Sequence, residues 1–239
     1  MAQFYVGLSG YSYKPWQGEG RFYPPELKQK QFLSYYAERY NAVEMDGTWY
    51  RMPSEAGVKS WLEGSPEGFR YTFKVHRNVS HVSRLKPESI GSVKFMLERL
   101  APLEKAGKMG ALYVQLPPNF KRNDVRLKEF LEGLPPGHPY GIEFRNESWF
   151  VPEVEEMLRN HKVAWVAWDT DEVAGQRRDT GHFLYVRMRR ESYTDEKLKS
   201  WADWFQRALD QGKDCYAFIK HEDEGSPWID ADRLLKLMS

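Results

Sequence analysis

A single cysteine and the absence of any long apolar run exclude two classes of protein at the outset. Cys215 has no partner cysteine within the chain, so no internal disulfide can form, which is typical of a reducing compartment such as the cytoplasm. No stretch of 18 apolar residues occurs, and we therefore expect no membrane-spanning segment and no membrane partner. The first ten residues contain no basic region followed by an apolar run, so we also expect no signal peptide.

Net charge is nearly absent as well. The 35 lysine and arginine residues are balanced by 34 aspartate and glutamate residues, which leaves a formal net charge of +1 and no global field that would attract nucleic acid. Charged residues make up 29% and hydrophobic residues 41% of the chain, a composition typical of a folded domain. Aromatic residues reach 15%, and such residues line ligand pockets as well as cores.

Short apolar runs alternate with amphipathic stretches along the whole chain. The expected strands are Phe4–Ser9, Ala42–Asp46, Arg70–Lys74, Met109–Leu116, Tyr140–Phe144, Val163–Trp168, Phe183–Met188 and Cys215–Lys220. The expected helices are Lys30–Arg39, Glu55–Leu62, Ile90–Ala106, Val125–Leu131, Pro152–Asn160, Asp195–Leu209 and Ile229–Met238. No convincing helix follows the sixth strand, and residues 170–182 are expected to form a loop.

This alternation predicts a parallel sheet, and the chain length favours its closure into a barrel. We expect a single, somewhat irregular (β/α)8 TIM-type barrel over residues 1–239, with long loops at the carboxyl ends of its strands. An open doubly wound sheet is the alternative. It usually carries a glycine-rich phosphate turn after its first strand, whereas the turn here reads Ser9-Gly10-Tyr11-Ser12-Tyr13.

Charged residues gather where the expected strands end. Side chains alternate between the two faces of a strand, so Glu44 and Asp46 oppose the apolar Val43 and Met45. The other strands follow the same pattern, and together they place four acids and four bases at one end of the barrel: Glu44, Asp46, Glu143, Asp169, Lys74, Arg145, Arg187 and Lys220. Active sites of such barrels lie at the carboxyl ends of the strands, so these residues predict a mixed-charge pocket there.

The pocket suggests an enzyme that acts on a small anionic molecule or phosphoester by acid–base catalysis, as a hydrolase, an isomerase or a lyase. Glu143 and Glu44 are the expected acid and base, and His81 is a candidate proton carrier. Further substrate-binding candidates, led by the cations that suit a carboxylate or phosphate, are Lys74, Arg145, Arg187, Tyr11, Trp16, Tyr50, Arg51, Gln115, Trp149, Asp169 and Lys220.

Other interpretations of the same residues stay open. A closed salt-bridge network could merely fix the register of the barrel, although burying so many ions is costly. A divalent metal could bind Glu44, Asp46, Glu143, Asp169, His76 and His221, but four cations in the same mouth oppose it, so we expect neither a required metal nor a cofactor. Aromatic and basic residues in the rim could instead bind nucleic acid, or the pocket could sense a metabolite without converting it. The oligomeric state is not determined by the sequence.

Several spaced motifs resemble those of the YecE-like family, the domain of unknown function numbered 72. The motifs are Gly10-Tyr11-Ser12-Tyr13 with Trp16 and Phe22-Tyr23-Pro24, Val43-Glu44 with Thr48-Trp49-Tyr50-Arg51-Met52-Pro53, Phe73-Lys74 with Ser80-His81, Gln115-Leu116-Pro117-Pro118 with Phe120, and Glu143-Phe144-Arg145 with Ser148-Trp149. The resemblance covers nearly the whole chain and implies a TIM-type barrel, but it brings no settled activity, substrate or cofactor.

The chain departs from the commoner family pattern at two strand ends. Many relatives follow the seventh strand with Arg-Phe-His-Gly, whereas here Arg187 precedes Met188-Arg189-Arg190. Many also end the eighth strand with an asparagine pair, where this chain has Lys220-His221-Glu222-Asp223. The resemblance therefore implies that this side of the pocket differs in charge from that of the commoner relatives.

Overall fold

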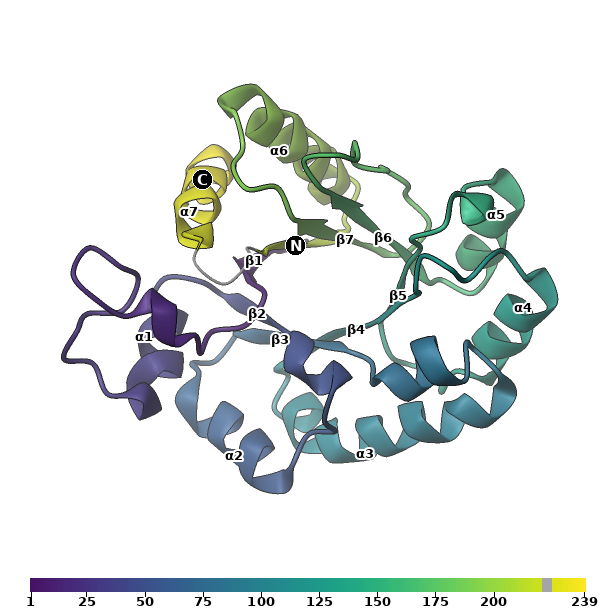
Figure 1. Ribbon diagram of the computed structural model, residues 1–239, viewed down its shortest axis with the longest axis horizontal. Helices are drawn as coiled ribbons and strands as arrows, with labels where there is room; N and C mark the ends of the chain where they lie inside the picture. The colour runs from purple at the N-terminus through teal and green to yellow at the C-terminus, as the bar shows by residue number, and fades with distance from the viewer. Residues whose placement is uncertain (221–224) are drawn as a thin grey trace.

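Eight parallel strands form the inner wall of the molecule, in the order β1-β8-β7-β6-β5-β4-β3-β2 (Figure 1). The strands are β1 (Phe4–Leu8), β2 (Ala42–Met45), β3 (Arg70–Lys74), β4 (Met109–Gln115), β5 (Tyr140–Glu143), β6 (Ala164–Asp169), β7 (Phe183–Met188) and β8 (Asp214–Ile219). The computed structural model describes residues 1–220 and 225–239. It confirms the TIM-type barrel, and each strand lies within about one residue of its predicted bounds.

Helices surround the strands on the outside of the barrel (Figure 1). They are α1 (Phe32–Ala37), α2 (Glu55–Gly64), α3 (Ile90–Lys105), α4 (Asp124–Gly133), α5 (Pro152–Asn160), α6 (Asp195–Asp210) and α7 (Pro227–Met238). Residues 170–182 contain no helix, as expected. In the described part of the chain, no helix combines the length and apolar character needed to cross a bilayer.

The helix beginnings follow local capping chemistry. Thr194 accepts a hydrogen bond from the Lys197 backbone N–H and begins α6, and Pro152 occupies the first turn of α5. The predicted helix over Lys30–Arg39 was wrong in part, because a 3-10 turn at Gln29–Gln31 precedes a shorter α1. Residues 30 and 31 thus adopt the tighter turn, and regular α-helix begins only at residue 32.

Two apolar cores share the barrel wall. The larger lies between the strands and the surrounding helices. The smaller fills the inside of the barrel and consists of Tyr5, Ala42, Ala111, Tyr113, Ala164, Val166, Phe183, Tyr185, Tyr216 and Phe218. Because alternate residues of each strand point inward, this inner core is continued toward the carboxyl ends by the inward polar residues. The barrel interior is therefore packed with aromatic and small apolar side chains, and polar side chains fill its end at the carboxyl ends of the strands. We call this end of the barrel the mouth.

The barrel closes between β1 and β2 through side chains rather than a regular ladder. Only one bridge, Ser9 to Glu44, joins these two strands within the described residues. Below it, the Tyr36 hydroxyl accepts a hydrogen bond from a backbone N–H of β1 and donates one to the Ala42 carbonyl of β2, at 2.7 and 2.8 Å. Gly7 permits this closure, because a Cβ atom there would lie 1.9 Å from the Ala42 oxygen. The closure brings Ser9 and Glu44 together.

Candidate functional site

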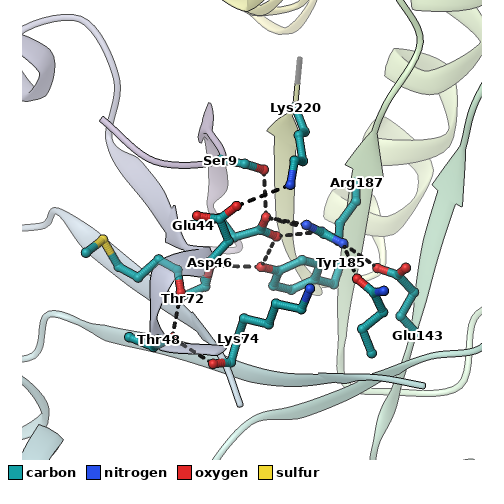
Figure 2. A network of polar contacts seen from close by, with 12 residues as sticks. Ser9, Glu44, Asp46, Thr48, Thr72, Lys74, Glu143, Tyr185, Arg187 and Lys220 are labelled. Carbon is teal, nitrogen blue, oxygen red and sulfur yellow. Dashed lines mark hydrogen bonds and ion pairs between the residues drawn. The ribbon is translucent and has the colours of Figure 1, made fainter. Parts of the chain in front are cut away.

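Arg187 is the centre of the polar mouth. Its guanidinium is fully buried, and Nε and Nη2 donate hydrogen bonds to the Glu44 carboxylate at 2.8 to 3.1 Å (Figure 2). Nη1 donates to Glu143 at 2.7 Å and to the Gln115 amide oxygen at 3.2 Å. The guanidinium carbon also lies 4.8 Å from the centre of the Tyr113 ring. One cation from β7 thus joins carboxylates from β2 and β5.

Glu44 is fully occupied by donors. Besides Arg187, it accepts hydrogen bonds from the Ser9 hydroxyl at 2.6 Å and the Tyr185 hydroxyl at 2.8 Å. The Tyr185 hydroxyl is in turn 2.8 Å from the Thr72 hydroxyl. Burial alone would raise the pKa of Glu44, but the positive charge of Arg187 and these donors outweigh it and hold the pKa below its usual range. Glu44 is therefore ionised at neutral pH.

Glu143 is held by two arginines. It accepts hydrogen bonds from Arg187 and from Arg145, and its side chain is fully buried. Its pKa is lowered to about 2, because the charges of Arg187 and Arg145 overcome the opposing effect of burial. The Arg145 guanidinium lies 3.8 Å from the centre of the Trp168 ring, so this predicted anion ligand is held between a carboxylate and an aromatic face.

Lys74 differs from the other cations of the mouth. It forms no ion pair with any carboxylate of the described residues, and its Nζ lies 5.0 Å from the centre of the Trp49 ring. In Figure 2 its side chain extends toward Tyr185 and Arg187, and no contact is drawn from its amine. Its pKa is lowered to about 8, chiefly by burial and then by Arg187, although the nearby carboxylates partly oppose the shift.

His81 lies against the same tryptophan. It belongs to the short π-helix Asn78–Val82, and its ring meets the Trp49 ring edge to face at 4.9 Å. Its Nδ1 is within hydrogen-bonding distance of the Ser80 hydroxyl, at 2.8 Å. Burial, followed by the charge of Lys74, lowers the pKa of His81, so the imidazole is neutral at pH 7. The His81 imidazole and the Lys74 amine, both of which can exchange protons, thus contact the same Trp49 ring.

The remaining predicted ions, Lys220, Asp46 and Asp169, form ion pairs that do not include Arg187. Lys220 donates to Asp46 at 3.3 Å, and this pair joins the ends of β8 and β2. Asp169 pairs with Arg190 at 2.7 Å and accepts a hydrogen bond from Tyr193. It therefore holds the segment after β7 and does not contact Arg187.

The predicted aromatic contacts divide between core and surface. Trp16 packs edge to face against Trp228, and the Trp149 indole donates to a backbone carbonyl, so both are buried in the outer core away from the Arg187 network. Tyr50 is 70% exposed and Arg51 is exposed beside it. Tyr11 is half-buried. The structure thus brings Glu44, Glu143 and Arg145 together around Arg187, but neither Asp169 and Arg51 nor these aromatic residues.

The sequence-based site omitted several residues that the structure places in it. These are Ser9, Thr72, Tyr113, Tyr185 and Trp49. The inward alternation of the strands would have found all of them except Trp49, which lies on a 3-10 turn after β2.

The acids and histidines near the carboxyl ends of the strands do not gather into a metal site in the described part of the chain. Within residues 1–220 and 225–239, no three His, Cys, Asp or Glu side chains are grouped so that they could hold a metal ion. His76 instead accepts a hydrogen bond from the Asn78 backbone N–H at 3.2 Å. His221, together with Glu222 and Asp223 of the divergent strand end, lies outside the described residues. That no metal is required stays a prediction.

The chain is similar to curated proteins and to solved structures. It is 31% identical over 157 residues to UPF0759 protein YecE of Escherichia coli K12 and 26% identical over 178 residues to UPF0759 protein YunF of Bacillus subtilis. The alignments cover 65% and 70% of this chain, but only 53% and 60% of those relatives. The chain therefore spans little more than half the length of the curated proteins it matches.

Two solved structures cover nearly the whole chain. A DUF72 family protein from Thermotoga maritima is 26% identical, with 99% of both chains covered and a TM-score of 0.84. A DUF72 family protein from Enterococcus faecalis is 20% identical, covers 100% of this chain and 98% of its own, and has a TM-score of 0.76, which supports the fold alone. The sequence model of the family described as "Protein of unknown function DUF72" matches residues 5–239, so the chain belongs to the DUF72 family.

Proposed function

We propose that this DUF72 protein is an enzyme that acts on a small anionic molecule by acid–base catalysis at the carboxyl ends of its strands. The observation that carries the proposal is Lys74, whose amine lies at this mouth with no carboxylate ion pair among residues 1–220 and 225–239 and with a pKa of about 8. General acid–base groups work best when their pKa is near the operating pH. His81, neutral at pH 7 beside the same Trp49 ring, provides a second group of this kind.

The two glutamates that the sequence suggested as acid and base have a different role in this site. Glu44 and Glu143 are buried and their oxygens accept hydrogen bonds from arginine, so a proton taken up by either would disrupt ion pairs with Arg187. They act here as positioning residues that fix Arg187 and the local field. Proton exchange with the substrate then falls to Lys74 and His81.

An anionic substrate is favoured by the uncompensated cations. Arg145, Arg187 and Lys220 all pair with carboxylates, whereas Lys74 and Arg189 form no ion pair within the described residues. Arg189 lies close enough for its charge to lower the pKa of Glu143. Two cations without ion pairs attract a carboxylate or a phosphate group, and neither is favoured over the other by this arrangement.

The nucleic-acid alternative has less support. Binding a single strand through the rim would need exposed aromatic faces on which bases stack. Trp16 and Trp149 are buried, which leaves Tyr50 as the most exposed of the predicted aromatic contacts. A sensor that binds a metabolite without converting it uses the same cations, so only a turnover measurement separates it from an enzyme.

A thermal-shift screen tests the proposed site. The purified protein is heated with sugar phosphates, sugar acids and 2-oxo acids, in parallel with Lys74→Met and with Lys59→Met, whose wild-type lysine is 75% exposed on α2. A ligand at a hundredfold excess over its dissociation constant stabilises the fold by about 2.7 kcal/mol. We expect one anion class to stabilise the wild type and Lys59→Met, but not Lys74→Met. Equal stabilisation of all three proteins, or of none, would contradict the proposal.

A further inference from the structure

The surroundings of Lys74 are those of a nucleophilic amine rather than of an ion-pair cation. Its charged neighbours of like sign are Arg187 and Lys220, Glu143 and Glu44 oppose them, and its Nζ lies over the face of the Trp49 ring, 5.0 Å from the ring centre. Within the described residues the ammonium group has no carboxylate ion pair and is largely removed from water, so the Trp49 face and the charges of Glu143 and Glu44 offset the effects of burial and Arg187 only in part, and the pKa stays lowered. Lysines that are desolvated and lie beside another cation lose their proton readily and become reactive toward carbonyl groups.

We propose that Lys74 forms an imine with a small carbonyl compound that also carries a carboxylate or phosphate group. The inference rests on the proposed function and gives it a substrate class and a covalent step. Lys74 ends β3, and β2, β7 and β8 border the same mouth. A carbonyl carbon that reaches its amine therefore lies at the end of the barrel where the paired and unpaired cations meet.

The step balances without any oxidant or reductant. The neutral Nζ attacks the carbonyl carbon and a C–N bond forms, while the π electrons move to the oxygen, which takes up a proton as the nitrogen loses one. A proton taken up from solvent through His81 then lets the hydroxyl leave as water, and the nitrogen lone pair forms the C=N bond of a protonated imine. Neutral amine, carbonyl compound and one proton thus give protonated imine and water, and release of the proton from nitrogen gives the neutral imine.

The neighbouring groups suit both halves of this step. With a pKa of about 8, roughly a tenth of the Lys74 amines are neutral at pH 7, far more than for a lysine of ordinary pKa. His81 packs on the Trp49 ring that also faces Lys74, and its neutral imidazole can accept the proton that the nitrogen loses and return it to the leaving hydroxyl. Arg189 forms no ion pair within the described residues and is the cation left to hold the anionic group of the substrate, since Lys220 already pairs with Asp46.

Borohydride trapping tests the inference on the intact chain. The protein is incubated separately with glyoxylate, pyruvate and dihydroxyacetone phosphate, then reduced with sodium borohydride, digested and mapped by mass spectrometry. We expect at least one probe to leave a reduced adduct on Lys74 at ten or more times the level on the exposed Lys59 of the same molecules. Propanal, a carbonyl compound without an anionic group, is expected to show no such preference.

Variants and a parallel readout separate the two proposals. Lys74→Arg should lose the adduct and Lys59→Arg should keep it, with circular dichroism confirming that both fold. If no probe labels Lys74 above Lys59, the imine is overturned, and the comparison needs no variant because both lysines belong to the wild-type chain. If an anion still stabilises the wild type but not Lys74→Met in the thermal screen, the proposed function survives that loss. If neither labelling nor stabilisation occurs, both fail.

Discussion

The guanidinium of Arg187 on β7 and the carboxylate of Glu44 on β2 meet at 2.8 Å across the mouth of the barrel, and both side chains are fully buried. Arg187 cannot point at a ligand as a free cation, because its donors are directed at Glu44, Glu143 and Gln115. Arg187 is therefore held in one position by Glu44, and from there its charge lowers the pKa of Lys74.

Glu44→Gln should destabilise the fold by about 3 kcal/mol, because it leaves Arg187 buried with part of its charge uncompensated. Urea unfolding monitored by fluorescence measures this loss. Glu63→Gln on α2 is the matched control, since Glu63 is 68% exposed and pairs with Lys59 at 3.8 Å. That control should change stability by no more than about 0.5 kcal/mol. If the two changes lowered the free energy of unfolding equally, the buried pair would contribute no more to stability than the exposed one.

Acid should destabilise the protein partly through Glu143. Its folded pKa of about 2 lies below its ordinary value of 4.5, so ionised Glu143 contributes stability that is present above pH 4.5. That contribution is lost as the pH falls from about 4.5 toward 2. Unfolding free energies of the wild type and Glu143→Gln should therefore converge over this interval. A difference that stays constant down to pH 2 would contradict the depressed pKa.

Lys74 should react with an amine reagent at unusually low pH. Trinitrobenzenesulfonate modifies only neutral amines, so the labelling rate of the Lys74 peptide should rise with a midpoint near pH 8. An ordinary lysine has a pKa of about 10.4. Peptide mapping across pH 6 to 11 measures the midpoint, and the Lys59 peptide of the same digests is the reference. A Lys74 profile that coincides with the reference would remove the basis for a reactive amine.

Lys74→Met should raise the pKa of His81 toward its ordinary value. The charge of Lys74 is the second cause, after burial, of the low pKa of that imidazole. NMR titration of the histidine ring protons measures the change. Lys59→Met is the control and should leave the titration of His81 where it is in the wild type. An unchanged His81 in Lys74→Met would mean that the two groups are not electrostatically coupled.

Gly7→Ala should prevent the β1–β2 seam from closing. The added Cβ would lie 1.9 Å from the Ala42 carbonyl oxygen and 2.5 Å from the Tyr36 hydroxyl, so the two strands must separate. We expect a loss of about 3 kcal/mol or more, measured by urea unfolding. Gly91→Ala in α3 meets nothing within 4 Å and should be neutral or slightly stabilising. A mild effect of Gly7→Ala would indicate that the seam is not tightly packed.

The sequence by itself determined the barrel and the end at which its polar residues gather. Strand periodicity is a local property, and alternation along β2 already separated Glu44 from the apolar Val43. The loop at residues 170–182 could also be predicted, because its sequence lacks a helical pattern. Where local geometry deviates from the regular period, as at the 3-10 turn that carries Trp49, the pattern gave no signal.

Only the tertiary structure decided which charges pair and which stay unpaired. Arg187 lies 143 residues from Glu44 and 44 residues from Glu143 along the chain, and no local sequence pattern predicts that one arginine binds both acids. Barrel closure sets those distances, and burial then sets the protonation of each group. Among the residues that the structure describes, the same closure leaves Lys74 without a carboxylate ion pair, because Glu44 and Glu143, the acids whose charges act on it, already accept hydrogen bonds from Arg187.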